Sequence, residues 1–305
     1  MKALLRNTYK NRALALMALP GVVLAVLFSY VPMAGLVTAF KRFDYSAGIW
    51  GSPWVWFDNF KFLFSSHDLT FRMLRNTVGY YLLFTAVTTV LNVALAIALN
   101  EARGKRFAKI AQSLMILPRF ISWVAVTFIV TALLDPKKGM FNHLLEQFGK
   151  NPVSWYTEPG YWPAILTIVV VWSSVGYGSV LYLSALAGMD EVFESAALDG
   201  ASKWQQIWYI TLPMLASLVC VLTLMGLGGI MTSNTGLFFQ VTKNVGALYP
   251  ATQTIDAYVL NALSSSNTSF GMTAAVTFFQ SFVGFAMVFS VNMIVRRIEP
   301  EFALF

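Results

Sequence analysis

Cysteine, histidine and charged residues are all scarce in this sequence. Its 305 residues include one cysteine, Cys220, and two histidines. Only 11% of the residues are charged, against roughly a quarter in ordinary soluble domains. A single cysteine excludes a disulfide framework, and the low charge excludes a disordered chain. No set of histidine, cysteine and carboxylate side chains has metal-ligand spacing, which excludes a metalloprotease of the HExxH kind.

A nucleotide-binding loop is also missing. A Walker A motif needs a glycine five residues before its Gly-Lys pair, but Leu99 precedes Gly104-Lys105 and Leu144 precedes Gly149-Lys150. The apolar stretches hold no histidine that could activate a serine and no pair of carboxylates for acid-base chemistry. We therefore expect a non-catalytic chain that binds no cofactor and no metal.

Apolar residues dominate instead: 57% of the chain is hydrophobic and 15% aromatic, with a mean hydropathy of +0.63. This balance excludes a soluble globular protein and indicates an integral membrane protein. The net charge of +7 then serves membrane orientation and contact with lipid headgroups, and we expect no nucleic-acid partner.

Six apolar stretches are each long enough to cross a bilayer, which takes about 20 residues per helix. We therefore predict an all-α membrane protein with six transmembrane helices. The first stretch follows a basic tail, residues 1–12, but it is too long for a signal peptide and is expected to be retained. The predicted spans are residues 13–40, 77–99, 110–134, 163–187, 213–231 and 270–295.

Basic residues are denser in the loops on the N-terminal side of the membrane, with eleven there against nine in the longer loops opposite. The positive-inside rule then places both termini of this multi-pass membrane protein in the cytoplasm. Residues 41–76 and 135–162 become external loops, the first with an aromatic interfacial segment and the second with a short amphipathic helix over 140–148. The chain, 1–305, is expected to be a single transmembrane domain.

Arg119 is the only formal charge inside the six predicted spans. An intramembrane charge is costly and therefore indicates function, but Arg119 follows Pro118, where a broken helix could equally let it reach backbone carbonyls or a headgroup. The lack of buried acids argues against a proton-coupled carrier.

The loop at residues 188–212 is too polar for the membrane and too regular for a linker. Gly200 separates two helical arms, and Asp199 or Ser202 is placed to cap the second arm. Small residues on the first arm favour docking into a partner, and the aromatics of the second arm are expected to pack back on the protein itself. A hairpin that simply lies in the membrane interface, without a partner, fits the pattern equally. One face of the first arm carries Phe193, Ala196 and Ala197, and one face of the second carries Trp204, Ile207, Trp208 and Thr211.

The sequence of this loop resembles the EAA signature of binding-protein-dependent ABC importer permeases. The signature residues are Glu194-Ser195-Ala196-Ala197-Leu198-Asp199-Gly200-Ala201, followed at the family spacing by Ile210-Thr211-Leu212-Pro213, with Ser195 in place of the usual alanine. The resemblance extends along nearly the whole chain to permeases for oligosaccharides and polysaccharide fragments. Its weaker motifs are Asp58-Asn59-Phe60, Leu74-Arg75-Asn76-Thr77, Leu117-Pro118, Ile121-Ser122-Trp123, Gly139-Met140-Phe141-Asn142 and Ala303-Leu304-Phe305.

This resemblance implies a pore of two permease subunits, the second a paralogue in a heterodimer. It also implies two ABC ATPase subunits, which bind ATP and Mg, and an external solute-binding protein that delivers an oligosaccharide to outer loops that include 41–76 and 232–262. Pro213 is expected to break the chain before the fifth span. The implied ATPase-coupling residues are Glu194, Ala196, Ala197, Asp199, Gly200, Ala201, Ile210, Leu212 and Pro213.

A sugar path is expected among polar and aromatic residues, because rings stack on sugar faces while amides and hydroxyls bind hydroxyl groups. Relatives tend to have Phe-Glu-Gln where this chain reads Phe238-Phe239-Gln240, and the missing acid favours an acidic oligosaccharide. The alternatives are a self-sufficient secondary carrier and a membrane enzyme. The candidate path residues are Arg119, Trp172, Tyr177, Tyr182, Asn234, Gln240, Lys243 and Asp256.

Overall fold

The structure, a computed structural model, describes residues 12–102, 104–264 and 269–298, and this part of the chain is helical without any β-strand. It divides into two compact units. The first unit comprises residues 12–66 and 269–279, and the second comprises 67–264 and 280–298. The prediction of an all-α protein is confirmed.

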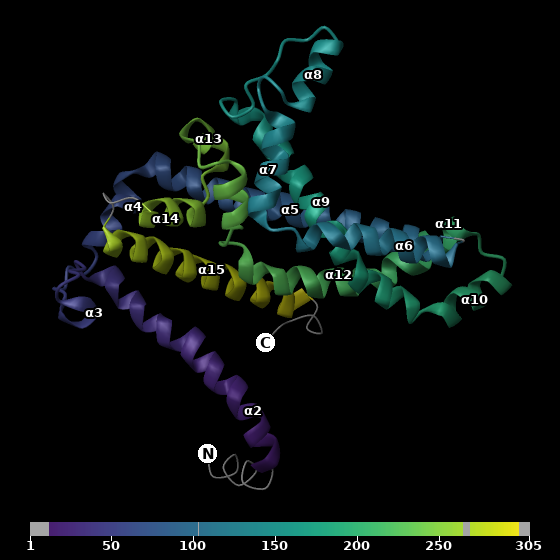
Figure 1. Cartoon of the computed structure of the whole chain (residues 1–305). Coiled ribbons are helices and arrows are strands. Elements are labelled where there is room, and N and C mark those ends of the chain that lie inside the picture. Colours follow the sequence, from purple (N-terminus) through teal and green to yellow (C-terminus); the bar gives the residue numbers. More distant parts are fainter. Residues whose placement is uncertain (1–11, 103, 265–268, 299–305) are drawn as a thin grey trace. The chain divides into compact units, whose positions relative to one another are not determined.

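The first unit begins with one long apolar helix, drawn in purple in Figure 1. It runs from Arg12 to Phe40 as α2 (Arg12–Ala25), a π-helical turn (Val26–Tyr30) and a 3₁₀ segment (Val31–Phe40). None of its most apolar window is buried, as expected of a helix whose side chains face lipid. The first predicted span is therefore confirmed as a membrane-length helix.

Buried polar contacts order the rest of this unit, which contains α3 (Gly48–Gly51) and α4 (Lys61–Ser65). Lys41 is 2% exposed, and its Nζ donates to the carbonyls of Ile49 and Trp50 at 3.0 and 2.9 Å. Asn59 donates to the carbonyls of Ala39 and Lys41 at 2.9 Å each. A Cβ at Gly271, in the first turn of α15 (Phe270–Ile298), would meet the Asn59 amide at 2.6 Å, so this approach requires glycine.

The second unit is built on two long helices, α5 (His67–Asn100) and α9 (Trp162–Ala187), which pack against each other. A Cβ at Gly178 would collide with the Asn92 side chain, so the missing side chain lets the two helices approach. α9 matches the fourth predicted span, and α15 matches the sixth. α5 begins ten residues before the predicted start at residue 77, so the end of the predicted 41–76 loop is helical.

The third predicted span is not one helix. α6 (Lys105–Ile116) continues into a 3₁₀ turn (Leu117–Phe120), and α7 (Trp123–Leu134) then departs at 99°. Pro118 lacks an amide proton, Ile121 is extended, and Ser122 caps α7 by accepting the Ala125 N–H. The predicted span over 110–134 is therefore a bent pair of helices and not one straight helix. The described residues contain five membrane-length helices, or six if this bent pair counts as one span.

The fifth predicted span is also longer than expected. Helix continues unbroken from Lys203 to Gly229 through α11 (Lys203–Gln206), a π-helical turn (Ile207–Thr211), α12 (Leu212–Gly226) and a final 3₁₀ turn. The Leu212 N–H donates to the Ile207 carbonyl, five residues back, so the π-turn absorbs the proline that follows. The expectation that Pro213 breaks the chain before the span is wrong.

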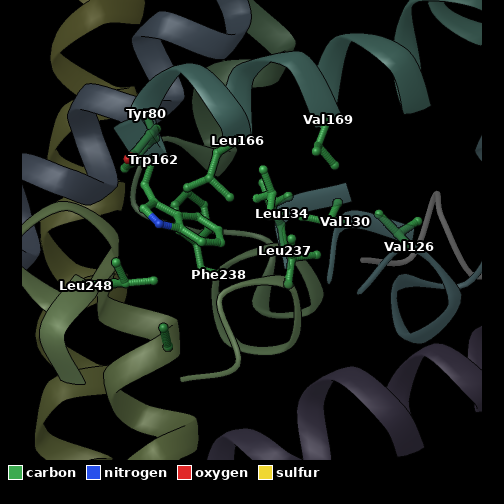
Figure 2. Close-up of a cluster of buried hydrophobic side chains, with 12 residues drawn as sticks. Tyr80, Val126, Val130, Leu134, Trp162, Leu166, Val169, Leu237, Phe238 and Leu248 are labelled. Carbon is green, nitrogen blue, oxygen red and sulfur yellow. The ribbon is translucent and has the colours of Figure 1, made fainter. Parts of the chain in front are cut away.

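The segment after the fifth span folds back into the core of the second unit (Figure 2). It contains a π-helix (Gly236–Val241), a 3₁₀ turn (Gly246–Leu248), α13 (Tyr249–Thr252) and α14 (Ile255–Ser264). Trp162 is fully buried, and its indole N–H donates to the Trp155 carbonyl at 2.8 Å. The predicted turn and amphipathic helix in the 135–162 loop are present as the Asp135 turn and α8 (Met140–Gln147). The core residues are Tyr80, Val126, Val130, Leu134, Trp162, Leu166, Val169, Leu237, Phe238, Val241, Leu248 and Ala257.

Candidate coupling hairpin and central cavity

Residues 188–212, hereafter the coupling hairpin, form two helical arms joined at Gly200. The first arm, α10 (Asp190–Leu198), ends in a Schellman motif: Gly200 N–H donates to Ala197 O at 3.1 Å, and Ala201 N–H donates to Ala196 O at 3.0 Å. Gly200 has φ +81°, where other L residues are strained. The small residues of the EAA signature therefore build a helix end that turns sharply.

The second arm begins with a capping box. The Ser202 hydroxyl accepts the Gln205 N–H, and the Gln205 side chain accepts the Ser202 N–H at 2.8 Å. Of the two caps that the sequence allowed, Ser202 caps this arm, while Asp199 is the C-terminal cap residue of α10. Both ends of the turn are thus fixed by local hydrogen bonds.

Apolar packing and an ion pair connect the coupling hairpin to the long helices. Phe193 packs against a buried cluster that includes Val93 of α5 and Leu186 of α9. Lys203 Nζ lies 3.0 Å from Oε2 of Glu101, the residue that follows α5. Sequence reasoning missed this ion pair, although Lys203 is the one basic residue of the hairpin and Glu101 is the one acid between residues 100 and 109.

The remaining hairpin surface is open and aromatic. Trp204 and Trp208 are 72% and 62% exposed, so the expectation that they pack back on the protein is wrong. Gln206 and Thr211 take the inward face instead, with 2% and 4% exposure. Glu194, Ala197, Asp199, Gly200 and Pro213 are exposed, whereas Ala196, Ala201, Ile210 and Leu212 are half-buried.

A cavity of about 180 Å³ lies where the bent pair meets α5, α9 and the segment after the fifth span. We call it the Arg119 cavity. Its wall combines one cation, hydroxyls and aromatic rings, and it includes Asn234. Among the described lining residues there is no carboxylate. The wall comprises Thr77, Tyr80, Tyr81, Phe84, Thr85, Arg119, Trp123, Val170, Ser173, Ser174, Thr232, Ser233, Asn234, Leu237 and Phe238.

Arg119 reaches this cavity because the 3₁₀ turn places it at the tip of the bend. Its guanidinium carbon lies 5.7 Å from the centre of the Tyr177 ring, a cation–π distance. Trp123, the first residue of α7, also lines the cavity, so the positive end of that helix adds to the charge of Arg119.

Asp256, in the first turn of α14, supports the opposite wall. One carboxylate oxygen accepts the Ser233 N–H and lies 3.0 Å from the Ser233 hydroxyl, and the other accepts the Gln280 amide at 3.1 Å. Ser233 lines the cavity, whereas Asp256 does not. Asp256 therefore acts on the cavity through Ser233.

The motif Leu74-Arg75-Asn76-Thr77 also supports this region, because it binds the backbone that precedes Asp256. Arg75 donates to the Pro250 carbonyl at 2.8 Å, and Asn76 donates to the Gln253 carbonyl at 3.1 Å. The Thr77 hydroxyl accepts the Ile255 N–H at 3.0 Å. These bonds clamp residues 250–255 to α5, just ahead of Asp256.

The other candidate path residues lie elsewhere. Trp172 is 41% exposed, Gln240 is exposed, and Tyr182 is buried between α5, α9 and α12. Lys243, with φ +54°, places its Nζ 4.7 Å from the centre of the Tyr156 ring. None of these four borders the Arg119 cavity as described, and their role in a sugar path stays a prediction.

Residues 92–300 match the family described as "Binding-protein-dependent transport system inner membrane component". The chain belongs to this family. The match covers the bent pair, the coupling hairpin and the last two membrane-length helices. As a family member the chain is a transport permease and non-catalytic, and this membership favours the permease subunit over the secondary carrier and the membrane enzyme.

Curated relatives match this permease over nearly their whole length. Protein LplB of Bacillus subtilis is 31% identical over 96% of this chain and 91% of its own. The polygalacturonan/rhamnogalacturonan transport system permease protein YteP, also of Bacillus subtilis, is 31% identical over 98% of this chain and 92% of its own.

The permease is also similar to a chain in each of two solved structures. One is a bacterial ABC transporter involved in the import of the acidic polysaccharide alginate, with a TM-score of 0.82 and 29% identity over 97% of this chain and 99% of that one. The other is a bacterial alginate ABC transporter in complex with an alginate pentasaccharide-bound periplasmic protein, with a TM-score of 0.83 and 29% identity over 96% and 97% of the chains. The predicted importer fold is confirmed, and the orientation of the termini stays a prediction.

Proposed function

We propose that this permease is the transmembrane subunit of an ATP-driven importer that moves an acidic oligosaccharide across the bacterial inner membrane. The observation that carries the substrate class is the Arg119 cavity, which has a cation and no carboxylate among its described lining residues. An external solute-binding protein delivers the oligosaccharide to the outer loops.

The chemistry of the cavity suits a uronate residue. Arg119 forms charge-assisted hydrogen bonds with a carboxylate, and the start of α7 adds positive potential. Ser173, Ser174 and Asn234 offer groups that bind sugar hydroxyls, and Tyr80 and Trp123 offer faces for a sugar ring. A neutral sugar would leave the Arg119 guanidinium without a counter-charge in this cavity.

Similar proteins support the same substrate class. One similar structure is an importer of the acidic polysaccharide alginate, and one relative transports polygalacturonan and rhamnogalacturonan. The resemblance noted in the sequence implies an acid at the position of Phe239, so this chain has one negative charge fewer in the segment after the fifth span.

ATP coupling is assigned to the coupling hairpin. Its exposed first arm, with Glu194 and Ala197, docks in a groove on an ABC ATPase, and Phe193 passes that motion to α5 and α9. Two such ATPases hold the ATP and Mg, and a second permease, a paralogue, completes the pore. The chain itself has no Walker A loop.

Uptake competition tests the substrate class. Cells that express the importer take up a labelled uronate oligosaccharide, and unlabelled competitors are added either with free carboxylates or with the carboxylates reduced to neutral alcohols. We expect only the charged competitor to reduce uptake. Equal competition by the neutral form would refute an acidic substrate.

Affinity purification in mild detergent tests the assembly. Mass spectrometry of the proteins that stay bound to the tagged permease should find an ABC ATPase and a second permease. The ATPase should be lost when Glu194 and Gly200 are replaced. Recovery of this chain alone, with transport that needs no ATP, would identify a secondary carrier.

A further inference from the structure

A second cavity, of about 330 Å³, lies along α6 and is called the α6 cavity. It is lined by Arg106, Lys109, Ile110, Ser113 and Leu114, which recur at helical spacing on one face. The two cations come first and the apolar side chains follow. This order matches the headgroup and the acyl chain of a lipid that lies along the helix.

Within the part of the chain that the structure describes, the charges at the start of α6 have no salt-bridge partner. α6 has no acid in its first turn and no side-chain cap at Gly104, so the positive end of the helix coincides with basic residues. No salt bridge to Arg106 or Lys109 occurs within the described ranges. The nearest acid in sequence, Glu101, is engaged by Lys203. The arrangement therefore favours an anion from outside the chain.

The surroundings of this cavity are apolar. Phe107, Ile110 and Leu114 are 71%, 61% and 60% exposed on a helix that forms one limb of the bent pair. A free inorganic anion would leave these side chains uncovered, whereas a phospholipid covers them with its acyl chains while its phosphate contacts the cations. We propose that the α6 cavity binds the headgroup of an anionic phospholipid, with Arg106 and Lys109 on the phosphate and the Ser113 hydroxyl beside it.

The bound lipid has a mechanical consequence. α6 runs directly into the 3₁₀ turn that carries Arg119, and its last turn packs on α9, where Gly176 leaves room for the Met115 carbonyl. A headgroup bound to the first turn of α6 therefore restrains one end of this helix, and the other end leads to Arg119 and its cavity. This effect does not depend on which sugar the permease carries.

Lipid titration of the intact importer tests the site. The complex is purified in mild detergent, and the binding of phosphatidylglycerol and of phosphatidylcholine is followed by native mass spectrometry and by the temperature of unfolding. Each cation near a headgroup changes affinity about fivefold, so Arg106→Gln with Lys109→Gln should lower the affinity for phosphatidylglycerol about 25-fold. Lys109→Gln alone should lower this affinity about fivefold, whereas Lys109→Arg, which keeps the charge, should retain the wild-type affinity.

The matched control is Arg296→Gln with Arg297→Gln, which removes the same charge from the last turn of α15, outside the residues that line the α6 cavity. It should leave the affinity for phosphatidylglycerol nearly unchanged. Equal losses in both double variants would show general charge attraction and overturn the site. Equal binding of phosphatidylcholine, or equal stabilisation by inorganic phosphate, would overturn it as well.

Discussion

Lys203 Nζ lies 3.0 Å from Oε2 of Glu101, so an ion pair ties the second arm of the coupling hairpin to the end of α5. The Lys203 side chain is 68% exposed and that of Glu101 is 28% exposed. Such a partly exposed pair contributes only about 0.2–1 kcal/mol to stability. Its importance is positional, because it links the coupling hairpin to α5, the longest helix of the second unit.

Charge reversal of this pair should uncouple transport without unfolding the protein. We expect Lys203→Glu and Glu101→Lys each to lower the sugar imported per ATP hydrolysed, and the double reversal to restore it. Lys61→Glu, which reverses an exposed pair with Asp58, is the control and should leave the ratio unchanged. Loss of coupling in the double reversal equal to that in each single variant would contradict a role for the ion pair.

Gly200 tests the geometry of the hairpin turn, because open space surrounds the position of its absent Cβ and only the backbone is at stake. Asparagine tolerates the left-handed conformation and should retain coupling, whereas alanine should cost about 1 kcal/mol of strain. Proline cannot adopt φ +81° and also removes the bond to Ala197.

We therefore expect Gly200→Asn to retain coupling, Gly200→Ala to weaken it and Gly200→Pro to uncouple ATP hydrolysis from uptake, all with normal insertion in the membrane. ATPase activity and uptake are measured on the same membranes. Normal uptake by Gly200→Pro would refute the assignment of the hairpin as the coupling element.

Arg119 tests the cavity. Arg119→Gln should lower uptake of a uronate oligosaccharide roughly tenfold, because a charge-assisted contact is lost. Lys243→Gln removes a cation that lies outside the described cavity wall and is the matched control. Kinetics of uptake measure both. A larger loss in Lys243→Gln than in Arg119→Gln would move the sugar path to the exposed residues that follow the fifth span.

Asp256 tests the support of the cavity wall. Asp256→Ala removes the acceptor of the half-buried Ser233 N–H and one of the two acceptors of the buried Gln280 amide, which keeps its bond to the Met231 carbonyl. A buried donor without a partner costs about 1–3 kcal/mol. Thermal unfolding of the purified complex should show a lower midpoint, with Glu158→Ala, an exposed acid, as the control. An unchanged midpoint would show that the carboxylate does not support the wall.

The turn at Asp135 predicts a pH dependence. Backbone N–H bonds from Lys138 and Lys137 to the carboxylate, with the nearby lysine charges, hold its pKa below the ordinary 3.8. Because this pKa is lowered on folding, the ionised carboxylate stabilises the turn at every pH above the ordinary pKa of 3.8. The stabilisation is lost as the pH falls through the folded-state pKa. Protease sensitivity of residues 135–139 should therefore differ between wild type and Asp135→Ala at neutral pH and converge in acid. A difference that persists below the folded-state pKa would contradict it.

The spacing of the EAA signature predicted the hairpin well, because Gly200 and Ser202 act through local backbone geometry that a short segment encodes. The length of the apolar stretches predicted most of the spans, because the length needed to cross a bilayer is also encoded in one continuous segment. Pro118 indicated a break in the helix, but the 99° angle was not predicted, because hydropathy continues across Pro118 whatever the direction of the next helix.

Contacts between distant segments were the main omission. The ion pair of Lys203 with Glu101 and the packing of the segment after the fifth span depend on tertiary neighbours, which periodicity does not report. Trp204 and Trp208 were placed inward because they are apolar, yet Gln206 occupies that face. An apolar side chain in a membrane protein is compatible with lipid or with a partner, so its burial cannot be assigned from composition.

Uptake into proteoliposomes tests the central claim most directly. The purified importer is reconstituted with its solute-binding protein, and the import of a labelled uronate oligosaccharide is measured with ATP on the ATPase side or with a proton or sodium gradient alone. The account predicts import with ATP only, and its loss in Gly200→Pro. Import driven by an ion gradient without ATP would contradict it.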